Sequence, residues 1–221
     1  MNPGSSRRQT RPRAERRLAF LAAAAGVFGV RGYHDASMAD IARAAGAATG
    51  TLYLYFQNKE ELYVALLEEK MLELSREVKT AEGGDSAPWA VLGRAVRAQL
   101  GFYERNRTFF QTFVRERLEM KARLQRRNWE RVARAAGRHT RLMADFIVRG
   151  QRQGVIRRGD ARRLALALLG MVNQLARDEL SHLRGQKFAA HAEFVVDLFA
   201  HGAGAGPEGR VAVSGPAQAK H

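Results

Sequence analysis

The sequence predicts an all-α fold, and two observations support this. Apolar residues recur at steps of three and four positions as far as about residue 202, and short Gly, Pro or Asp breaks separate the segments. The alternating patterns that are typical of strands are almost absent. We therefore expect helices at about 14–30, 38–45, 49–56, 59–80, 86–105, 108–119, 121–153, 160–184 and 187–201.

Composition divides the chain into four parts. Residues 1–13 are predicted to form a flexible basic arm, because they contain Arg7, Arg8, Arg11 and Arg13. Residues 14–73 are predicted to form a small helical head, and residues 74–202 a larger helical body. Gly, Ala and Pro dominate residues 203–221, so a disordered tail is expected there.

The charge of the chain is strongly positive, at +15, with 37 Lys and Arg against 22 Asp and Glu. This favours a polyanionic partner or an acidic membrane surface. The surplus is uneven: residues 1–62 hold 9 basic and 5 acidic side chains, whereas residues 104–163 hold 18 and 6. Most of it therefore lies outside the head, where solvated helix faces and attraction of an acidic ligand are both consistent with it.

The absence of cysteine excludes disulfides, thiolate zinc sites and cysteine nucleophiles, and suits a reducing compartment. Nothing reaches the roughly 18 uninterrupted apolar residues of a membrane span, so we expect a cytoplasmic protein without a membrane partner. Arg16 and Arg17 before the apolar run 18–30 offer an alternative, an export signal. Helical spacing within that run and the lack of an obvious cleavage site argue against export.

Residues 37–56 carry the pattern of a helix-turn-helix. Ser37 is a good N-cap, and Asp40 lies favourably in the first turn of the helix that follows. Gly46 falls where a tight turn between two helices requires positive φ. Leu52 and Phe56 then form the buried stripe of the second helix.

The other side chains of that second helix suit a DNA reader. Small residues permit close approach to base edges in the major groove, and Tyr hydroxyls suit phosphate oxygens. Lys59 opens the next helix and adds a cation. Half-buried aromatic rings and a solvated charge are the alternative interpretation of these side chains. The candidate DNA-contacting residues are Ser37, Thr49, Gly50, Thr51, Tyr53, Leu54, Tyr55 and Lys59.

Together, these residues resemble the signature of the TetR (tetracycline repressor) family. The resemblance covers about residues 14–73 and rests on Phe28, Gly32-Tyr33, Ser37-Met38, Asp40-Ile41-Ala42, Ala45-Gly46, Gly50-Thr51-Leu52-Tyr53, Tyr55-Phe56 and Lys59-Glu60-Glu61-Leu62. It implies a three-helix DNA-binding head, a helical effector-binding body and dimerisation through the last two helices. It also implies that Thr49, Gly50, Thr51 and Leu54 face bases or the adjacent backbone, while Ser37, Tyr53, Tyr55 and Lys59 contact phosphates.

The sequence departs from the family pattern at Ala47-Ala48, where a branched apolar residue and then Ser or Thr are usual. Ala48 has no side chain that could cap the recognition helix or bond a phosphate. Two roles are therefore open for Thr49, as the substitute cap or as a base contact.

The body contains a candidate effector site. Trp129, Val132, Ala136, His139, Met143 and Phe146 form an apolar stripe with one polar interruption. His139 is either a hydrogen-bonding group in a ligand pocket or a satisfied core histidine, and the second is the commoner situation. Asn173 permits the same two interpretations. The candidate pocket residues are Phe102, Phe109, Phe110, Phe113, Trp129, His139, Met143, Phe146 and Asn173.

Two apparent motifs carry no function. Residues 204–209 match G-x-G-x-x-G, but no strand precedes them. Asp178 and His182 lie one helical turn apart without a third metal ligand. We expect neither a metal nor a cofactor, and no nucleophile with a matching base is visible.

We hypothesise a ligand-responsive transcriptional repressor that binds a pseudo-palindromic DNA operator as a homodimer and is released by an unknown small-molecule effector, hydrophobic or acidic. The alternatives are a basic module that binds lipid or RNA, and an enzyme that acts in the helical body.

Overall fold

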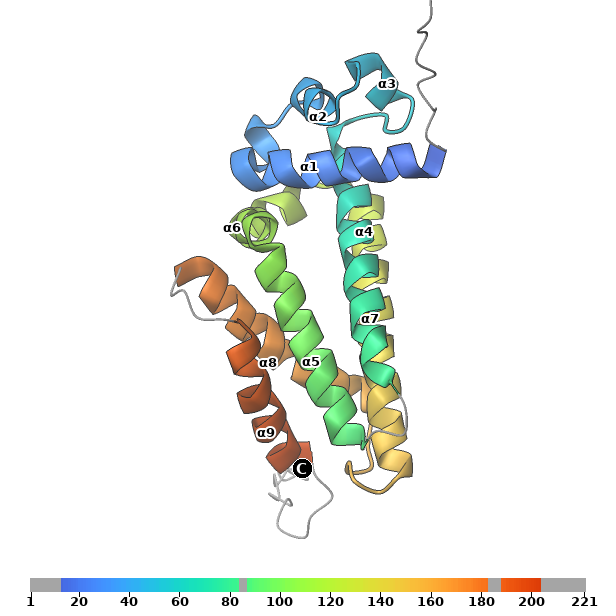
Figure 1. Cartoon of the computed structure of the whole chain (residues 1–221), viewed down its shortest axis with the longest axis vertical. Coiled ribbons are helices and arrows are strands. Elements are labelled where there is room, and N and C mark those ends of the chain that lie inside the picture. The colour runs from blue at the N-terminus through green and yellow to red at the C-terminus, as the bar shows by residue number, and fades with distance from the viewer. Residues whose placement is uncertain (1–12, 84–86, 183–187, 204–221) are drawn as a thin grey trace, which may run out of the picture. The chain divides into compact units, whose positions relative to one another are not determined.

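The structure is a computed structural model that describes residues 13–83, 87–182 and 188–203, without the side chains of residues 117–123, 182 and 203. Within these ranges the chain is built from helices (Figure 1), which confirms the predicted all-α fold. The helices are α1 (Arg13–Asp35), α2 (Met38–Ala44), α3 (Thr49–Tyr53), α4 (Lys59–Lys79), α5 (Pro88–Arg105), α6 (Arg107–Arg123), α7 (Arg126–Arg152), α8 (Ala161–His182) and α9 (His191–Ala203). Short 3-10 turns occupy Thr80–Glu82 and Phe188–Ala190.

Each predicted helix is present, but several boundaries differ, including the end of α6 at Arg123 instead of about residue 119 and the start of α9 at His191 instead of about residue 187. α1 continues to Asp35 across a non-helical residue, Gly32, at φ 81°. α3 ends at Tyr53 instead of residue 56, although Phe56 is buried as predicted. α7 starts at Arg126 instead of about residue 121, where Glu60 Oε1 accepts from Gln125 N at 2.9 Å. That hydrogen bond comes from a residue 65 positions away, so local periodicity could not reveal it.

The first of two compact units contains residues 13–73, 105–137 and 180–182. Its core is formed by Phe20, Phe28, Ile41, Leu52, Phe56, Leu62 and Leu66. Here α1 lies against α6 (Figure 1). The Thr112 hydroxyl on α6 donates to the Gly29 carbonyl on α1 at 2.7 Å. A Cβ at Gly29 would lie only 3.3 Å from Phe109 N, so the missing side chain allows this close approach.

The second unit contains residues 74–83, 87–104, 138–179 and 188–203, with α5, most of α8 and α9, and the neighbouring parts of α4 and α7. Its core includes Leu92, Val96, Leu100, Phe102, Met143, Phe146, Ile147, Leu168, Val172 and Phe188. Trp89 on α5 meets Phe199 on α9 edge to face, with ring centroids 6.2 Å apart. This aromatic pair helps to fix α9 on α5.

The arm at residues 1–12, the tail at 204–221, the G-x-G-x-x-G segment and the side chain of His182 lie outside the described part of the chain. Arg13, at the end of the predicted arm, is the first residue of α1. Among the described residues, no helix meets the length and hydropathy that a membrane crossing requires. The predicted head–body boundaries stay a prediction, since the compact units combine α6 and the start of α7 with the head.

Candidate nucleic-acid interface

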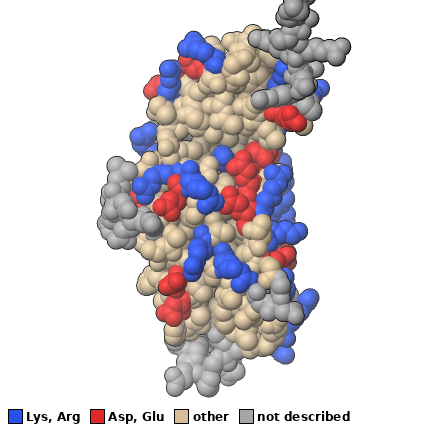
Figure 2. Space-filling model, viewed as in Figure 1, with Lys and Arg blue, Asp and Glu red and all other residues tan. Residues whose placement is uncertain are grey.

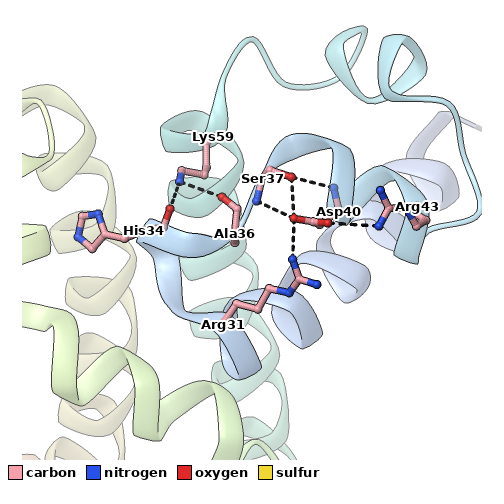
Figure 3. A network of polar contacts seen from close by, with 7 residues as sticks. All are labelled: Arg31, His34, Ala36, Ser37, Asp40, Arg43 and Lys59. Carbon is pink, nitrogen blue, oxygen red and sulfur yellow. Dashed lines mark hydrogen bonds and ion pairs between the residues drawn. The ribbon is translucent and has the colours of Figure 1, made fainter.

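Ser37 caps α2 through a reciprocal capping box. Its Oγ accepts from Asp40 N at 3.1 Å, while the Asp40 carboxylate accepts from both Ser37 N at 3.3 Å and Ser37 Oγ at 2.7 Å (Figure 3). The Ser37 hydrogen bond is the main cause that lowers the pKa of Asp40, and Arg31, 2.9 Å away, acts in the same direction. Asp40 therefore stays ionised and joins the start of α2 to α1.

The turn between α2 and α3 has the predicted geometry. Gly46 adopts φ 65°, in the left-handed region that favours glycine. Behind the turn, Ile41, Ala42 and Leu52 are fully buried and Phe56 is 1% exposed. This core fixes α3 by one face only.

The opposite face of α3 is open to solvent. Leu54 is 74% exposed and Tyr53 is 49% exposed, while Gly50 is exposed and Thr49 and Thr51 are half-buried. Ala48 occupies the N-cap position without a side-chain cap, and Thr49 is the first helical residue. Of the two roles considered for Thr49, the structure therefore removes the substitute cap.

Tyr55 follows α3 and is half-buried. Its ring packs at 5.2 Å from that of Phe20, and the Arg13 guanidinium lies 5.8 Å from its centroid. The first turn of α1 therefore lies beside the end of the predicted reading helix.

Lys59 has neighbours that the sequence did not reveal. Its Nζ donates to the carbonyls of His34 at 3.0 Å and Ala36 at 2.9 Å (Figure 3), and it lies 4.7 Å from the centroid of the Tyr33 ring. Burial lowers the pKa of Lys59, and the charges of Asp35 and Glu116 oppose that shift. These hydrogen bonds attach Lys59 to the segment between α1 and α2. That segment ends at Ser37, the N-cap of α2.

Glu116 on α6 is a residue that sequence analysis missed. Its Oε2 accepts from Tyr33 N at 3.0 Å, immediately after the break in α1. A Cβ at Gly32 would collide with the other carboxylate oxygen of Glu116. Two reasons therefore favour glycine at position 32: its backbone has a positive φ, and the Glu116 carboxylate occupies the place where a Cβ would lie.

The candidate effector residues divide between the two units. Phe109, Phe110, Phe113 and Trp129 belong to the first unit, and Phe109 and Phe110 pack edge to face at 5.3 Å. Phe102, His139, Met143, Phe146 and Asn173 belong to the second. The predicted stripe on α7 is shifted in its middle, where Ala135 is buried and Ala136 is exposed.

His139 belongs to a polar network inside the second unit. Gln99, which is completely buried, donates through Nε2 to Tyr103 Oη and to Asn173 Oδ1, both at 3.1 Å. Its Oε1 therefore faces His139 Nε2 at 3.1 Å, so that ring nitrogen carries the proton. His139 Nδ1 is left as acceptor for the Ser75 hydroxyl at 3.3 Å.

Burial of His139 lowers its pKa to about 4, so the ring is neutral at physiological pH. Burial also raises the pKa of Tyr103 to about 12. Sequence analysis named His139 and Asn173 but missed Gln99, which joins them. The available signal was a glutamine among the apolar residues of α5.

On the face shown in Figure 2, acidic side chains lie among basic ones. Several body arginines are ion-paired, including Arg131 with Glu68 at 2.6 Å and Arg149 with Glu82 at 2.7 Å. Part of the positive surplus of residues 104–163 is therefore already matched by carboxylates. Among the described residues, no group of three or more His, Asp or Glu is placed to hold a metal ion.

Comparison with protein families settles which kind of protein carries this helix-turn-helix. The family described as "Bacterial regulatory proteins, tetR family" matches residues 20–66, and "Tetracyclin repressor-like, C-terminal domain" matches residues 85–177. The chain belongs to the TetR family. Membership places this TetR protein among transcriptional regulators and not among enzymes.

Curated relatives resemble parts of this TetR protein. A "Fatty acid metabolism regulator protein" of Bacillus subtilis is 42% identical over 64 residues, which are 29% of this chain and 31% of the relative. The "HTH-type transcriptional activator FasR" of Mycolicibacterium smegmatis is 41% identical over 102 residues, 46% of this chain and 47% of the relative. The chain thus spans less than half the length of these two relatives.

A solved structure extends the likeness to most of the fold. The crystal structure of "a transcriptional regulator FadR from Bacillus subtilis in complex with stearoyl-CoA" has a TM-score of 0.73 and 20% sequence identity. The match covers 83% of this chain and 97% of that one. At this identity, the match shows a shared fold.

Proposed function

We propose that this TetR-family protein is a repressor that binds a pseudo-palindromic DNA operator as a homodimer and releases it when a long-chain acyl thioester binds. The observation that carries DNA binding is the geometry of α3. Leu52 and Phe56 hold this short helix from behind, and its other face is exposed. A helix presented in this way can enter a major groove.

Within this proposal, Thr49, Gly50, Thr51 and Leu54 meet bases or the adjacent backbone. Ser37, Tyr53, Tyr55 and Lys59 serve the phosphate contacts. For Lys59, hydrogen bonds to the His34 and Ala36 carbonyls support an added role in positioning the phosphate-binding surface.

Selection from a random duplex pool, followed by titration of the selected duplex, tests the assignment. We expect Tyr55→Ala and Lys59→Ala to weaken binding at least tenfold each, since one charge-assisted hydrogen bond contributes about 1.5–3 kcal/mol. Val30→Ala is the matched control, because Val30 is the most exposed large apolar residue of the described head at 78%. Unchanged binding by both test variants, in protein that remains folded, would remove the assignment.

The second unit offers a surface for a second copy of the chain. Leu166 on α8 and Phe194 and Leu198 on α9 are exposed apolar residues, and the last two lie one turn apart. Nothing lies within 4 Å of a Cβ placed on Gly170, which shares the α8 face and permits close approach of another helix. Exposed apolar side chains of this size are typical of an interface.

Light scattering tests the homodimer. Phe194→Asp or Leu198→Asp should halve the mass, because each buries a charge in the interface. Val155→Asp, in the α7–α8 connection, is the control and should leave the mass unchanged. A monomeric wild-type chain at micromolar concentration would contradict the proposal.

The acyl thioester is proposed from two observations. Two relatives are named for fatty acid metabolism or crystallised with stearoyl-CoA. The second support is that Gln99 and His139 are hydrogen-bonded to each other on helices that also carry the buried side chains of Phe102, Met143 and Phe146. We propose that the acyl chain packs against the aromatic residues and that its polar end exchanges hydrogen bonds with this network.

Stearoyl-CoA is the probe, with free CoA and stearate as controls. Stearoyl-CoA should release the selected operator from the wild-type protein, whereas free CoA should not. His139→Leu should need a higher concentration of stearoyl-CoA for release while binding DNA equally well without it. If stearoyl-CoA released the operator from His139→Leu and from the wild type at the same concentration, His139 would not be part of the effector site.

The FasR relative is named as an activator, so activation is the second candidate function. A reporter promoter that carries the selected operator distinguishes the two. Repression predicts higher expression when the gene for this protein is deleted, and activation predicts lower expression.

A further inference from the structure

Asn173 on α8 is the point at which the polar network of the second unit reaches the surface. Its Oδ1 accepts from Gln99 Nε2 at 3.1 Å and from Tyr103 Oη at 2.9 Å. Gln99 is completely buried, whereas Asn173 is exposed. Among the described residues, both hydrogen bonds of the Asn173 side chain use Oδ1. Its amino group is therefore left to bond an acceptor outside the network.

Asn173 also lies in the middle of the α8 face that we propose for the homodimer. Exposed residues follow one another on this face at steps of four, three and four positions, and they are Leu166, Gly170, Asn173 and Arg177. A second copy that covers the face takes the Asn173 amino group out of water, where it requires a hydrogen-bond acceptor. An asparagine in a helix interface can fix the register of the two helices through such a bond.

The network permits two arrangements of its hydrogen bonds, because each amide presents both a donor and an acceptor. In the observed arrangement, His139 Nε2 donates to Gln99 Oε1, and Gln99 Nε2 donates to Asn173 Oδ1. If the Gln99 amide turns over, its Oε1 faces Asn173 Oδ1, and two acceptors then oppose each other. Asn173 has to turn over as well, while His139 accepts at Nε2 and donates through Nδ1 to the Ser75 hydroxyl. The group that Asn173 presents outward thereby changes from an amino group to a carbonyl.

We propose that Asn173 is a positioning residue that couples the effector site to the homodimer interface. Binding of the effector beside His139 turns over the amides of Gln99 and Asn173, and this changes the register of α8 against the second copy. The inference rests on the proposed function, from which it takes both the acyl thioester site and the homodimer. The polar end of the acyl thioester bonds the same groups of Gln99 and His139, so its binding competes with the observed arrangement. In the other register, the two heads no longer match the spacing of the half-sites.

The test measures coupling, defined as the operator Kd with saturating stearoyl-CoA divided by the operator Kd without it. Asn173→Leu removes the end of the network and keeps the α8 face apolar. Gln174→Leu, at the next exposed position of α8, is the matched control outside the network. Tyr103→Phe is a second test variant, which removes the hydroxyl that donates to Asn173 Oδ1 and leaves the α8 face unchanged. Light scattering and titration with stearoyl-CoA alone are carried out on the same proteins.

We expect the coupling of the wild type to be at least tenfold and that of Asn173→Leu to fall below about threefold. Tyr103→Phe should give an intermediate value, and Gln174→Leu should match the wild type. The mass should stay the same, and the separate affinities for the operator and for stearoyl-CoA should change by less than about threefold. A merely structural role of Asn173 would change these properties and leave the coupling intact.

Wild-type coupling in both Asn173→Leu and Tyr103→Phe would overturn the inference. If Asn173→Leu is monomeric, Tyr103→Phe decides alone, since its substitution lies on α5: reduced coupling supports the inference, and wild-type coupling overturns it.

Failure of the proposed function gives a different result. A monomeric wild-type chain, or a wild-type protein whose operator affinity does not respond to stearoyl-CoA, contradicts the homodimer or the effector and removes this inference with it. A wild-type dimer that stearoyl-CoA releases from the operator, with full coupling in both network variants, contradicts only the role of Asn173.

Discussion

The capping box and turn of the helix-turn-helix and the polar network around Gln99 both depend on polar groups or turn residues. The residues of the two features are separated by very different distances along the sequence. In the helix-turn-helix, Ser37, Asp40 and Gly46 act within ten residues of one another. The network joins Ser75, Gln99, His139 and Asn173 from four helices. The first is set by local sequence and faces solvent, whereas the second exists only after folding and is centred on the buried side chains of Gln99 and His139, with Asn173 at its exposed edge. We therefore expect substitutions in the network to cost more stability than those in the caps.

The largest effect is expected at Gln99. Gln99→Leu keeps the volume but leaves His139 Nε2–H without its acceptor and removes both donors to Tyr103 and Asn173, which should cost about 3–4 kcal/mol. Urea denaturation at fixed protein concentration measures the loss. Gln153→Leu, at an exposed position, should change stability by less than about 0.5 kcal/mol. Equal results for the two variants would show that the network does not stabilise the fold.

The second effect is a dependence on pH. Burial lowers the pKa of His139 to about 4, below the 6.5 of an exposed histidine. As pH falls from about 6.5 to 4, the unfolded chain therefore takes up a proton before the folded chain does, and stability decreases by about 3 kcal/mol. This component should be absent in His139→Leu and retained in the exposed variant His201→Leu. Denaturation midpoints between pH 7 and pH 4 provide the comparison.

A third, smaller effect is expected at Gly32. Gly32→Ala should cost about 2 kcal/mol, because φ 81° is unfavourable for alanine and its Cβ collides with Glu116. Adding Glu116→Ala should recover the part due to the collision but not the part due to φ. Gly26→Ala, in the same helix with open space around it, should instead stabilise by about 0.5–1 kcal/mol. Thermal unfolding of the wild type, Gly32→Ala, Glu116→Ala, the double variant and Gly26→Ala tests this, and additive effects of Gly32→Ala and Glu116→Ala would contradict the contact.

The smallest effects concern the two caps of the helix-turn-helix. Ser37→Ala should cost about 1 kcal/mol by breaking the capping box of α2. Ala48→Ser should gain up to about 1 kcal/mol, since the N-cap of α3 has no side-chain hydrogen bond. Calorimetry of both variants measures the change in the free energy of unfolding. We expect this change to be a loss for Ser37→Ala and a gain for Ala48→Ser, although the two caps belong to one motif. A loss at both positions would mean that Ala48 is already optimal.

The outcome of each prediction from sequence depended on the range of the interactions involved. Ser37 as a cap and positive φ at Gly46 were confirmed because both features depend on neighbouring residues. The start of α7 was misplaced where a residue far away in the sequence supplies a hydrogen-bond partner. Glu60 accepts from Gln125 N across 65 positions.

The candidate sites show the same division. Sequence identified His139 and Asn173 as polar interruptions of apolar helices but could not join them, because Gln99 supplies both connections from a third helix. It identified Lys59 as a cation at the start of α4 but not its bonds to the His34 and Ala36 carbonyls. Glu116 gave no sequence signal, since a carboxylate on a helix surface is ordinary until Gly32 is placed beside it.

By itself, the sequence determined the all-α fold, the helix-turn-helix and its caps, and the resemblance to the TetR family, because helical periodicity and turn chemistry act over a few residues. Tertiary structure alone decided the neutral state of His139, the contact of Glu116 with the break in α1 and the place of Lys59. Each of these depends on desolvation or on a hydrogen bond between distant segments, and neither exists before the helices pack.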